Sequence, residues 1–550
     1  MSVKHYGIYL AYAPTVDLRK EGLGRHLAAF LKAAIQRDDV HFVVACPSWS
    51  KESLLELCES EGISPKDFDI ISPLRKPILL RVFQAFQAYW SRPKKSSRFS
   101  RIANVLRLCY LSHRHWLEAS FASSRSIWSL LALSFYLLVL SLIIMPFALT
   151  AMVILGTLHL VKRNLRWIER KSLISIGIRK LRVLTSNPKD DGFAYRLFRF
   201  MEKHESALLL QQINSLEHVA AWYSPTAFWP AFNHITAPCL MCVPDVVLAD
   251  FPVGFANVGG DRFMDSFQQV ESAIRGCEHF VTYSEQIKWS TLVDRYAIKA
   301  NAVHVIHHAP NALNQLVTIS GFPDVEEASL NYCKSLLRSA MHKASNPNYA
   351  KTFLNGSVHF LFYASQFRPN KNIISLLRAY EYLLRKRFIG HKLILTGRPL
   401  VLPEVSKFIK EHHLENDVLC LHGLTTAELA ACYRLADLAV NPSLSEGGCP
   451  FTFTEALSVS TPAVMARIPV TMEVLNDPSL DEVMFFDPYN WRDMADRIEW
   501  AIHHRNELLA IQKPIYEKLS KRTWGDVVEE YINILDLITS PVNQARVGVQ

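Results

Sequence analysis

Residues 437–456, DLAVNPSLSEGGCPFTFTEA, contain the pattern that decides the fold. The apolar run 438–440 is typical of a buried strand, and the Asn-Pro pair that follows ends it. A short polar loop comes next, and residues 451–457 are typical of the first turns of a helix. In open α/β sheets, ligands bind where strand ends lead into helix N-termini, so this stretch predicts a binding site.

The loop and the helix start each contain a carboxylate. Glu446 precedes Gly447 and Gly448 in the loop, and Glu455 lies on the predicted helix. Free backbone N–H groups at such a place suit phosphate. The carboxylates are better suited to accept hydrogen bonds from hydroxyl groups, as from ribose or a sugar. A surface loop with two solvated glutamates is the alternative.

The bulk composition favours a multidomain protein with an anionic partner. The chain has 550 residues, too many for one hydrophobic core. Its net charge of +9 favours membrane lipid, nucleic acid or a phosphorylated ligand. The hydrophobic content of 49% exceeds what a plain soluble enzyme needs, and the excess has a local source in one apolar insertion.

The ten cysteines are scattered, mostly in apolar surroundings typical of buried free thiols. Cys239 and Cys242 form a single CxxC without a second pair, which is weak evidence for a zinc site. We therefore expect no metal site and place the catalytic part in a reducing compartment. Residues 1–30 are typical of a strand, a loop and a helix, so we expect no signal peptide there.

The chain begins with the pattern of a doubly wound domain. Residues 6–12 are an apolar strand, and residues 41–46 are a second one. Between them a loop with Gly22 and Gly24 leads into a predicted helix at 25–35. Strand, glycine loop, helix and strand in this order predict a nucleotide-binding fold. A tight turn into a helix, without a phosphate, is the alternative for the glycines.

An apolar insertion interrupts this domain between residues 75 and 205. Residues 126–161 contain no Asp, Glu, Lys or Arg, and basic segments such as 92–101 lie on both sides. The run is longer than the about 20 residues of one bilayer crossing and slightly short for two. Basic flanks and Pro146 near the middle predict a helical hairpin in the cytoplasmic leaflet. A buried helical hairpin of a soluble protein is the alternative.

The α/β alternation resumes after the insertion and continues almost to the end. We expect an N-terminal domain at 1–320, a linker at 321–350 and a second domain at 351–522. A helix at 523–540 follows, with the first domain as one candidate for its packing partner. The fold class is therefore α/β, with two doubly wound Rossmann-like domains that face a cleft, the usual place for a ligand.

Several motifs in the second domain resemble the donor-binding half of family-4 glycosyltransferases of the GT-B fold. They are ASQFRPNKN at 364, LILTGRP at 393, LHGLTTAELAACYRLADLAVNPSLSEGGCPFTFTEAL at 421 and TPAV at 461. The first domain is similar more loosely, through its glycine loop, FVTYSE at 280 and VIHHAPN at 305. The resemblance covers about two thirds of the chain, and the apolar insertion lies outside the common core of the family.

The resemblance implies specific roles for donor-binding residues. Lys371 takes the place of a phosphate-contacting lysine, and Arg368 substitutes for an arginine that the family often has where this chain has Gln366. Glu455 matches the glutamate that binds ribose, and Glu446 matches the one near the transferred sugar. The two are nine positions apart, one more than is common in the family. The expected donor-binding set is Gly22, Gly24, Arg368, Lys371, Gly447, Gly448 and Glu455.

The expected catalytic set is Glu446, Asp245 and His307. Asp245 stands in a Pro-Asp pair where the family has a His-Asp pair, which makes it a candidate acceptor-side carboxylate, with a helix cap or turn as the alternative. His307 and His308 follow a predicted strand, and one of them is expected either to line the sugar site or to pack in the core. The resemblance further implies a retaining reaction without a bound metal or other cofactor.

We therefore expect a hexosyltransferase that uses a nucleotide-sugar donor and a lipid-linked or membrane-proximal saccharide acceptor. It would act at the cytoplasmic face of the cytoplasmic membrane, in polysaccharide or glycolipid biosynthesis, with membrane lipid as a further partner. A GT-B nucleotide-sugar epimerase and a non-catalytic sugar-nucleotide-binding scaffold remain as alternatives. No nucleic-acid-binding motif accompanies the basic residues, so we expect no nucleic-acid partner.

Overall fold

A computed structural model describes residues 3–91, 193–345 and 358–540, apart from positions 15, 21, 260 and 449. It also describes scattered positions between 112 and 145. The chain divides into two compact units. Residues 1–76 and 198–550 form one unit, which contains both β-sheets and therefore both α/β domains. Residues 77–197, within the predicted insertion, form the other.

The first sheet contains seven parallel strands in the order β3-β2-β1-β4-β5-β6-β7. Alternate side chains enter two cores: Tyr6 and Ile8 pack on one face with α1 (Gly22–Ala34), whereas Tyr9 packs on the other with α7 (Phe193–Ile213). Both faces are buried, so the strands are almost wholly apolar. Their bounds are β1 Lys4–Tyr9, β2 Val40–Ala45, β3 Asp69–Ile71, β4 Val219–Ser224, β5 Cys239–Cys242, β6 His279–Thr282 and β7 Val303–Val305.

The second sheet contains six parallel strands in the order β10-β9-β8-β11-β12-β13. The predicted strand, loop and helix of residues 437–456 are present as β11 (Leu438–Asn441) and α16 (Phe451–Ser458). The other strands are β8 Phe360–Tyr363, β9 Lys392–Thr396, β10 Val418–Leu421, β12 Ala463–Ala466 and β13 Phe485–Phe486. The helices that follow in sequence include α13 Ile373–Lys386, α14 Pro403–Glu411, α15 Thr426–Leu435, α18 Trp491–His503 and α19 Arg505–Leu519.

The predicted linker contains α11 (Val325–Met341), which packs against α15 as part of the second domain. Cys333 and Leu337 of this helix are buried in the core of that domain. Just beyond the helix, Lys343 Nζ lies 2.5 Å from the Glu428 carboxylate of α15. The segment is therefore packed structure for most of its length.

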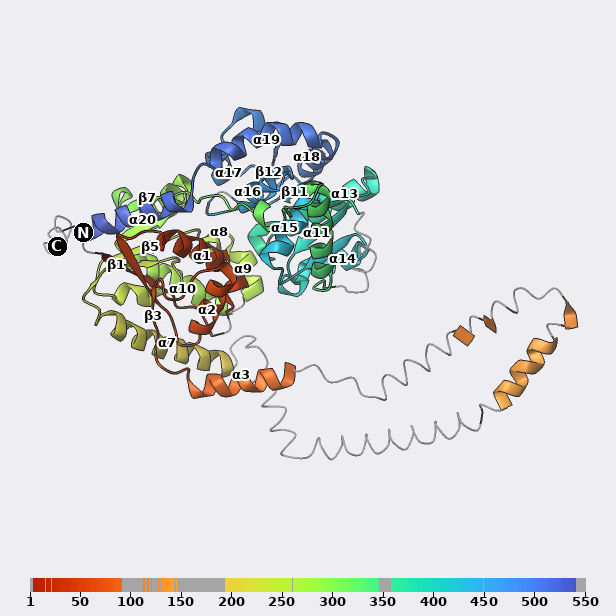
Figure 1. Ribbon diagram of the computed structural model, residues 1–550, viewed down its shortest axis with the longest axis horizontal. Helices are drawn as coiled ribbons and strands as arrows, with labels where there is room; N and C mark the ends of the chain where they lie inside the picture. Colours follow the sequence, from red (N-terminus) through yellow and green to blue (C-terminus); the bar gives the residue numbers. More distant parts are fainter. Residues whose placement is uncertain are drawn as a thin grey trace. The chain divides into compact units, whose positions relative to one another are not determined.

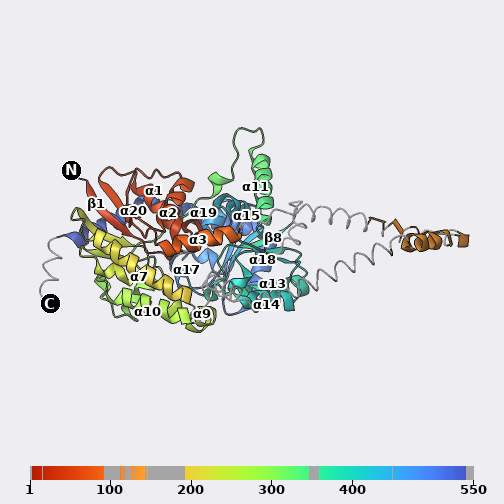
Figure 2. The same cartoon turned by 90° about the horizontal axis from the view of Figure 1, so that it is seen from below.

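The C-terminal helix α20 (Trp524–Thr539) packs on the first sheet, beside β1 and α1 (Figures 1 and 2). Tyr531 and Leu535 are fully buried in the core that contains Tyr6 and Ile8. The Asp536 carboxylate accepts hydrogen bonds from Tyr6 Oη at 2.5 Å and from Lys4 Nζ at 2.8 Å. The chain therefore returns to its first domain after completing the second.

The predicted apolar hairpin at 126–161 lies largely outside the described residues. Positions 131–142 of it are helical, and their apolar side chains include the exposed Phe135, Leu138 and Leu142. No helix in the described part of the chain is both long and apolar enough to cross a membrane.

The packing of α20 predicts a contrast between two leucines of the same helix. Leu535→Ala is expected to lower the free energy of unfolding by about 2–5 kcal/mol, because it leaves a cavity in the first core. Leu537 is 49% exposed, so Leu537→Ala should cost far less. Urea denaturation followed by tryptophan fluorescence measures both, and equal losses would show that α20 is not packed as described.

Candidate functional site

Two loops at the carboxyl ends of neighbouring strands are bound to each other. The loop after β8 ends in a short 3₁₀ helix, Pro369–Lys371, and the loop after β11 carries Glu446. The Leu444 N–H donates to the Asn370 carbonyl at 2.8 Å, and Asn370 Nδ2 donates to the Ser445 carbonyl at 3.1 Å. These bonds hold the two loops in one arrangement at the edge where open α/β sheets bind ligands.

The two loops bring Lys371 and Glu446 into an ion pair. Lys371 Nζ lies 2.5 Å from Glu446 Oε1, and the two side chains are only 18% and 16% exposed. Burial lowers the pKa of Lys371, but the Glu446 carboxylate, with Tyr363 and Asp245, raises it by more. The lysine is therefore a fixed positive charge over the whole physiological pH range.

Asp245 reaches the same group from the first domain. It follows β5, and burial raises the pKa of its carboxyl, although the cations of Lys371 and Arg368 oppose this effect. Gly447 makes the approach possible, because a Cβ at that position would lie 1.8 Å from the Pro244 carbonyl oxygen. Asp245 of the first domain thus interacts electrostatically with the Lys371–Glu446 pair of the second.

Gly448 allows a second close contact with the first domain. A Cβ there would lie 2.9 Å from Tyr283 Cβ and 3.1 Å from His308 Cδ2. Beside it, Ser284 Oγ donates to the Gly447 carbonyl at 2.9 Å. The glycine pair therefore lies directly against the carboxyl ends of the first-sheet strands.

Glu455 is buried on α16 and is held by residues of the first domain. Arg25 Nη1 and Asn311 Nδ2 lie 3.3 and 3.4 Å from Glu455 Oε1. Burial raises the pKa of the Glu455 carboxyl, and hydrogen bonds from Arg25, Asn311 and Tyr433 lower it by less. This carboxylate has hydrogen-bond donors in place of the hydroxyl groups that the sequence predicts for it.

The two histidines after β7 have different surroundings. His307 is half-exposed: its Nδ1 lies 3.0 Å from the Tyr283 carbonyl, its Nε2 is 4.0 Å from Glu473, and no contact among the described residues joins it to Glu446. His308 is partly buried, with its ring 3.8 Å from that of Tyr283, beside Gly448. Burial holds the pKa of His308 well below its usual value, so the ring is neutral. Of the two, His308 lies against the loop after β11 that carries Glu446, which we call the site loop.

Gly22 and Gly24 form the first turn of α1, so the predicted loop at these positions and a helix start at residue 25 were wrong. A Cβ at position 24 would lie 1.9 Å from the Leu18 carbonyl oxygen, so close backbone packing explains this glycine. Arg368 is exposed and donates to Gln366 Oε1 at 2.9 Å. Its positive charge nevertheless acts to lower the pKa of Asp245.

Sequence reasoning missed Arg25, Asn311 and Tyr433. Arg25 follows the glycines directly, and Asn311 ends the VIHHAPN motif, so both stood inside recognised segments. Tyr433 also lies inside a recognised segment, the motif that begins at 421, but a buried tyrosine on a helix is usually a core residue and drew no attention.

Comparison with known proteins bears on this arrangement. Residues 347–518 match the family described as Glycosyl transferases group 1. The second domain is therefore similar to glycosyltransferase domains of group 1. The matched range contains Lys371 and Glu455, which the sequence assigned to the donor, and Glu446, which it assigned to catalysis.

A solved structure of Anabaena Alr3699/HepE in complex with UDP and glucose shares the GT-B fold, at 12% identity and a TM-score of 0.52 over 97% of this chain and 99% of that one. The serotype-specific mannosyltransferase WbdA of Escherichia coli is 25% identical over 42% of this chain and 27% of its own. The O-antigen chain mannosyltransferase RfbU of Salmonella typhimurium is 25% identical over 48% of this chain and 64% of its own. The chain thus spans less than two thirds of these curated relatives.

The raised pKa of Glu455 predicts a pH-dependent cost to stability. A carboxyl whose folded pKa exceeds its unfolded pKa loses stability as pH rises between the two values, by about 1.4 kcal/mol per unit of difference. Glu455→Gln should therefore raise the midpoint of thermal unfolding at pH 7 and change it little near pH 4. The control is Glu517→Gln on the exposed side of α19. A stabilisation that is the same at both pH values would contradict this origin.

Proposed function

We propose that this protein transfers a hexosyl group from a nucleotide-sugar donor to a saccharide acceptor. The observation that carries the proposal is the largely buried ion pair of Lys371 and Glu446 at the carboxyl ends of β8 and β11, where the charge of Asp245 from the first domain also acts on Lys371. A fixed cation at this edge suits a diphosphate. The mannosyltransferase names of two relatives make a mannosyl donor the first to test.

In the proposed complex, the donor diphosphate binds Lys371, Arg368 and free N–H groups of the site loop. Its oxygens replace Glu446 as the partner of the lysine, which leaves the glutamate beside the transferred sugar. The ribose hydroxyls donate to Glu455 in place of Arg25 and Asn311. In this proposal protein cations and N–H groups, and not a bound metal, stabilise the leaving diphosphate.

The proposed reaction breaks the bond between the anomeric carbon and the diphosphate oxygen, forms a bond from that carbon to the acceptor oxygen, and passes the proton of the acceptor hydroxyl to the released diphosphate. The Asp245 carboxylate reaches this group from the first domain, where an acceptor would bind, and we assign it the hydrogen bond from that hydroxyl. We propose retention of the anomeric configuration, which NMR spectroscopy of the product determines directly.

We further propose a lipid-linked acceptor at the cytoplasmic face of the membrane. The support is the charge-free run 126–161 with its basic flanks, and the exposed apolar side chains Phe135, Leu138 and Leu142 within it. Apolar side chains with basic residues beside them suit an anionic lipid surface.

The site predicts a strong effect of two substitutions on transfer. Lys371→Ala and Glu446→Gln should each lower kcat by about 10²–10³-fold, because each removes charge or a hydrogen-bond acceptor beside the reacting group. The matched control is Lys343→Ala, which breaks an ion pair of the same length elsewhere in the domain. The assay measures released nucleoside diphosphate from a panel of nucleotide-sugars, with and without membrane extract.

Three results of that panel would separate the candidate functions. Release that requires extract supports transfer to an acceptor in the membrane. Turnover of the donor alone would favour the epimerase, and binding without turnover of any donor would favour the scaffold. If Lys343→Ala lost as much activity as Lys371→Ala, the loss would not be specific to the site, and the proposed role of Lys371 would be contradicted.

Deletion of residues 126–161 tests the membrane proposal. The shortened chain should leave the membrane pellet, whereas the full chain should stay there after a high-salt wash, because salt weakens charge contacts but not apolar insertion. If the shortened chain still sediments with membranes, the insertion does not anchor the protein.

A further inference from the structure

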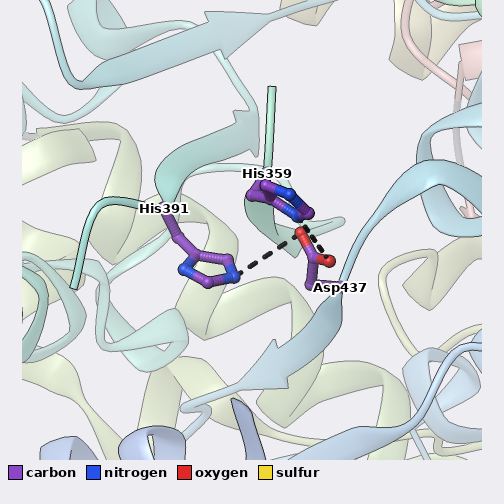
Figure 3. A group of neighbouring side chains, drawn as sticks. All are labelled: His359, His391 and Asp437. Atoms are coloured by element: carbon purple, nitrogen blue, oxygen red, sulfur yellow. Dashed lines mark hydrogen bonds and ion pairs between the residues drawn. The ribbon is translucent and has the colours of Figure 1, made fainter. Parts of the chain in front are cut away.

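Three side chains at the other edge of the second sheet form a group that the proposed reaction does not use. His359, His391 and Asp437 directly precede β8, β9 and β11. Lys371 and Glu446 follow the carboxyl ends of β8 and β11, so the group lies at the opposite, amino-terminal edge of the same sheet. Figure 3 shows both imidazole rings next to the Asp437 carboxylate.

The nitrogen and oxygen atoms of this group are spaced as a bound metal ion requires. His359 Nδ1 lies 3.0 Å from Asp437 Oδ1, and His391 Nε2 lies 3.6 Å from Asp437 Oδ2. One ligand atom from each residue lies within 4.8 Å of the others. Tetrahedral zinc has bonds of about 2.0–2.2 Å, which place neighbouring ligand atoms about 3.3 Å apart. Small side-chain rotations therefore suffice to complete the site.

The backbone holds the three positions together before any ion binds. The Lys392 N–H donates to the His359 carbonyl at 2.8 Å, and the Asp437 N–H donates to the Phe360 carbonyl at 3.0 Å. The Asp437 carboxylate accepts a hydrogen bond from the Phe360 N–H at 2.9 Å. The backbone carbonyl of Asp437 accepts one from Arg505 Nε at 3.0 Å. Ligands on adjacent strands of a buried sheet lose little freedom on binding.

The charged neighbours leave the carboxylate available. Lys392 forms an ion pair with Asp417 at 2.5 Å, and Arg505 Nε donates to the backbone carbonyl of Asp437, not to its carboxylate. His503, at the end of α18, lies close enough to His391 to interact with it electrostatically. A third imidazole is thus near the group, and His359 is exposed to solvent.

We propose that His359, His391 and Asp437 bind one divalent transition-metal ion of the zinc class, with water or His503 in the remaining position. Two imidazole nitrogens and one carboxylate oxygen suit Zn²⁺, Co²⁺ or Ni²⁺, whereas Mg²⁺ and Ca²⁺ prefer oxygen ligands throughout. The ion joins the starts of three strands at the edge away from the donor residues. Its role is to stabilise the second domain, and it takes no part in the transfer reaction.

Titration of the chelator-treated full chain with Zn²⁺ tests this site. Calorimetry should show one strong equivalent for Zn²⁺ and none for Mg²⁺, and a 100-fold excess of Zn²⁺ over its Kd should raise Tm by about 3 °C or more. His391→Ala and Asp437→Asn should weaken binding at least about tenfold. Asn at position 437 keeps an oxygen for the Phe360 N–H, so this variant retains the strand contact. His342→Ala, which removes an exposed histidine at the end of α11, should bind as the unchanged chain does.

Cobalt absorption separates this site from the cysteines. Co²⁺ bound to the group should give a spectrum without a thiolate charge-transfer band, and His391→Ala should abolish that spectrum. The proposal fails if the unchanged chain binds no stoichiometric ion, if His391→Ala and Asp437→Asn bind as His342→Ala does, or if the thiolate band appears. None of these measurements depends on transfer activity, so the metal site can fail or hold independently of the proposed function.

Discussion

The ion pair between Lys371 and Glu446 is the interaction on which the site depends. Two opposite charges with side chains less than a fifth exposed would each be costly alone, because burial penalises an unpaired ion by several kcal/mol. Together, and with the charge of Asp245 acting on them, they form a largely buried charged group. Such a group contributes little to stability compared with apolar packing, which makes it a mark of function.

The glycine pair at 447 and 448 is the constraint that brings the first domain to this ion pair. Any side chain at Gly447 would collide with the Pro244 carbonyl, and one at Gly448 would collide with Tyr283. The loop has one residue more than is common in the family that the sequence resembles, and the close contact of both glycines gives that local insertion a physical use. At these two positions the backbone of the second domain therefore lies directly against the first domain, with no room for a side chain on the loop.

Local pattern was enough to predict the strand, loop and helix around Glu446, because apolar runs, Asn-Pro and Gly-Gly act over a few residues. The resemblance assigned Lys371 and Glu455 to donor binding, and that assignment stays a prediction. Nothing in the sequence could pair Arg25 with Glu455, which are separated by 430 residues, because that contact depends on how two domains meet. A different reason hides His359, His391 and Asp437: they lie within one domain and are neighbours only through the strand order of its parallel sheet.

The return of α20 to the first sheet has a consequence for synthesis on the ribosome. The apolar face that α20 covers, with Tyr6 and Ile8 beneath it, is made first and is completed only after the entire second domain has been translated. The nascent first domain must therefore wait with an uncovered hydrophobic surface while the second domain folds. Such an interval is where chaperones engage a chain, and a pause before residue 524 would prolong it.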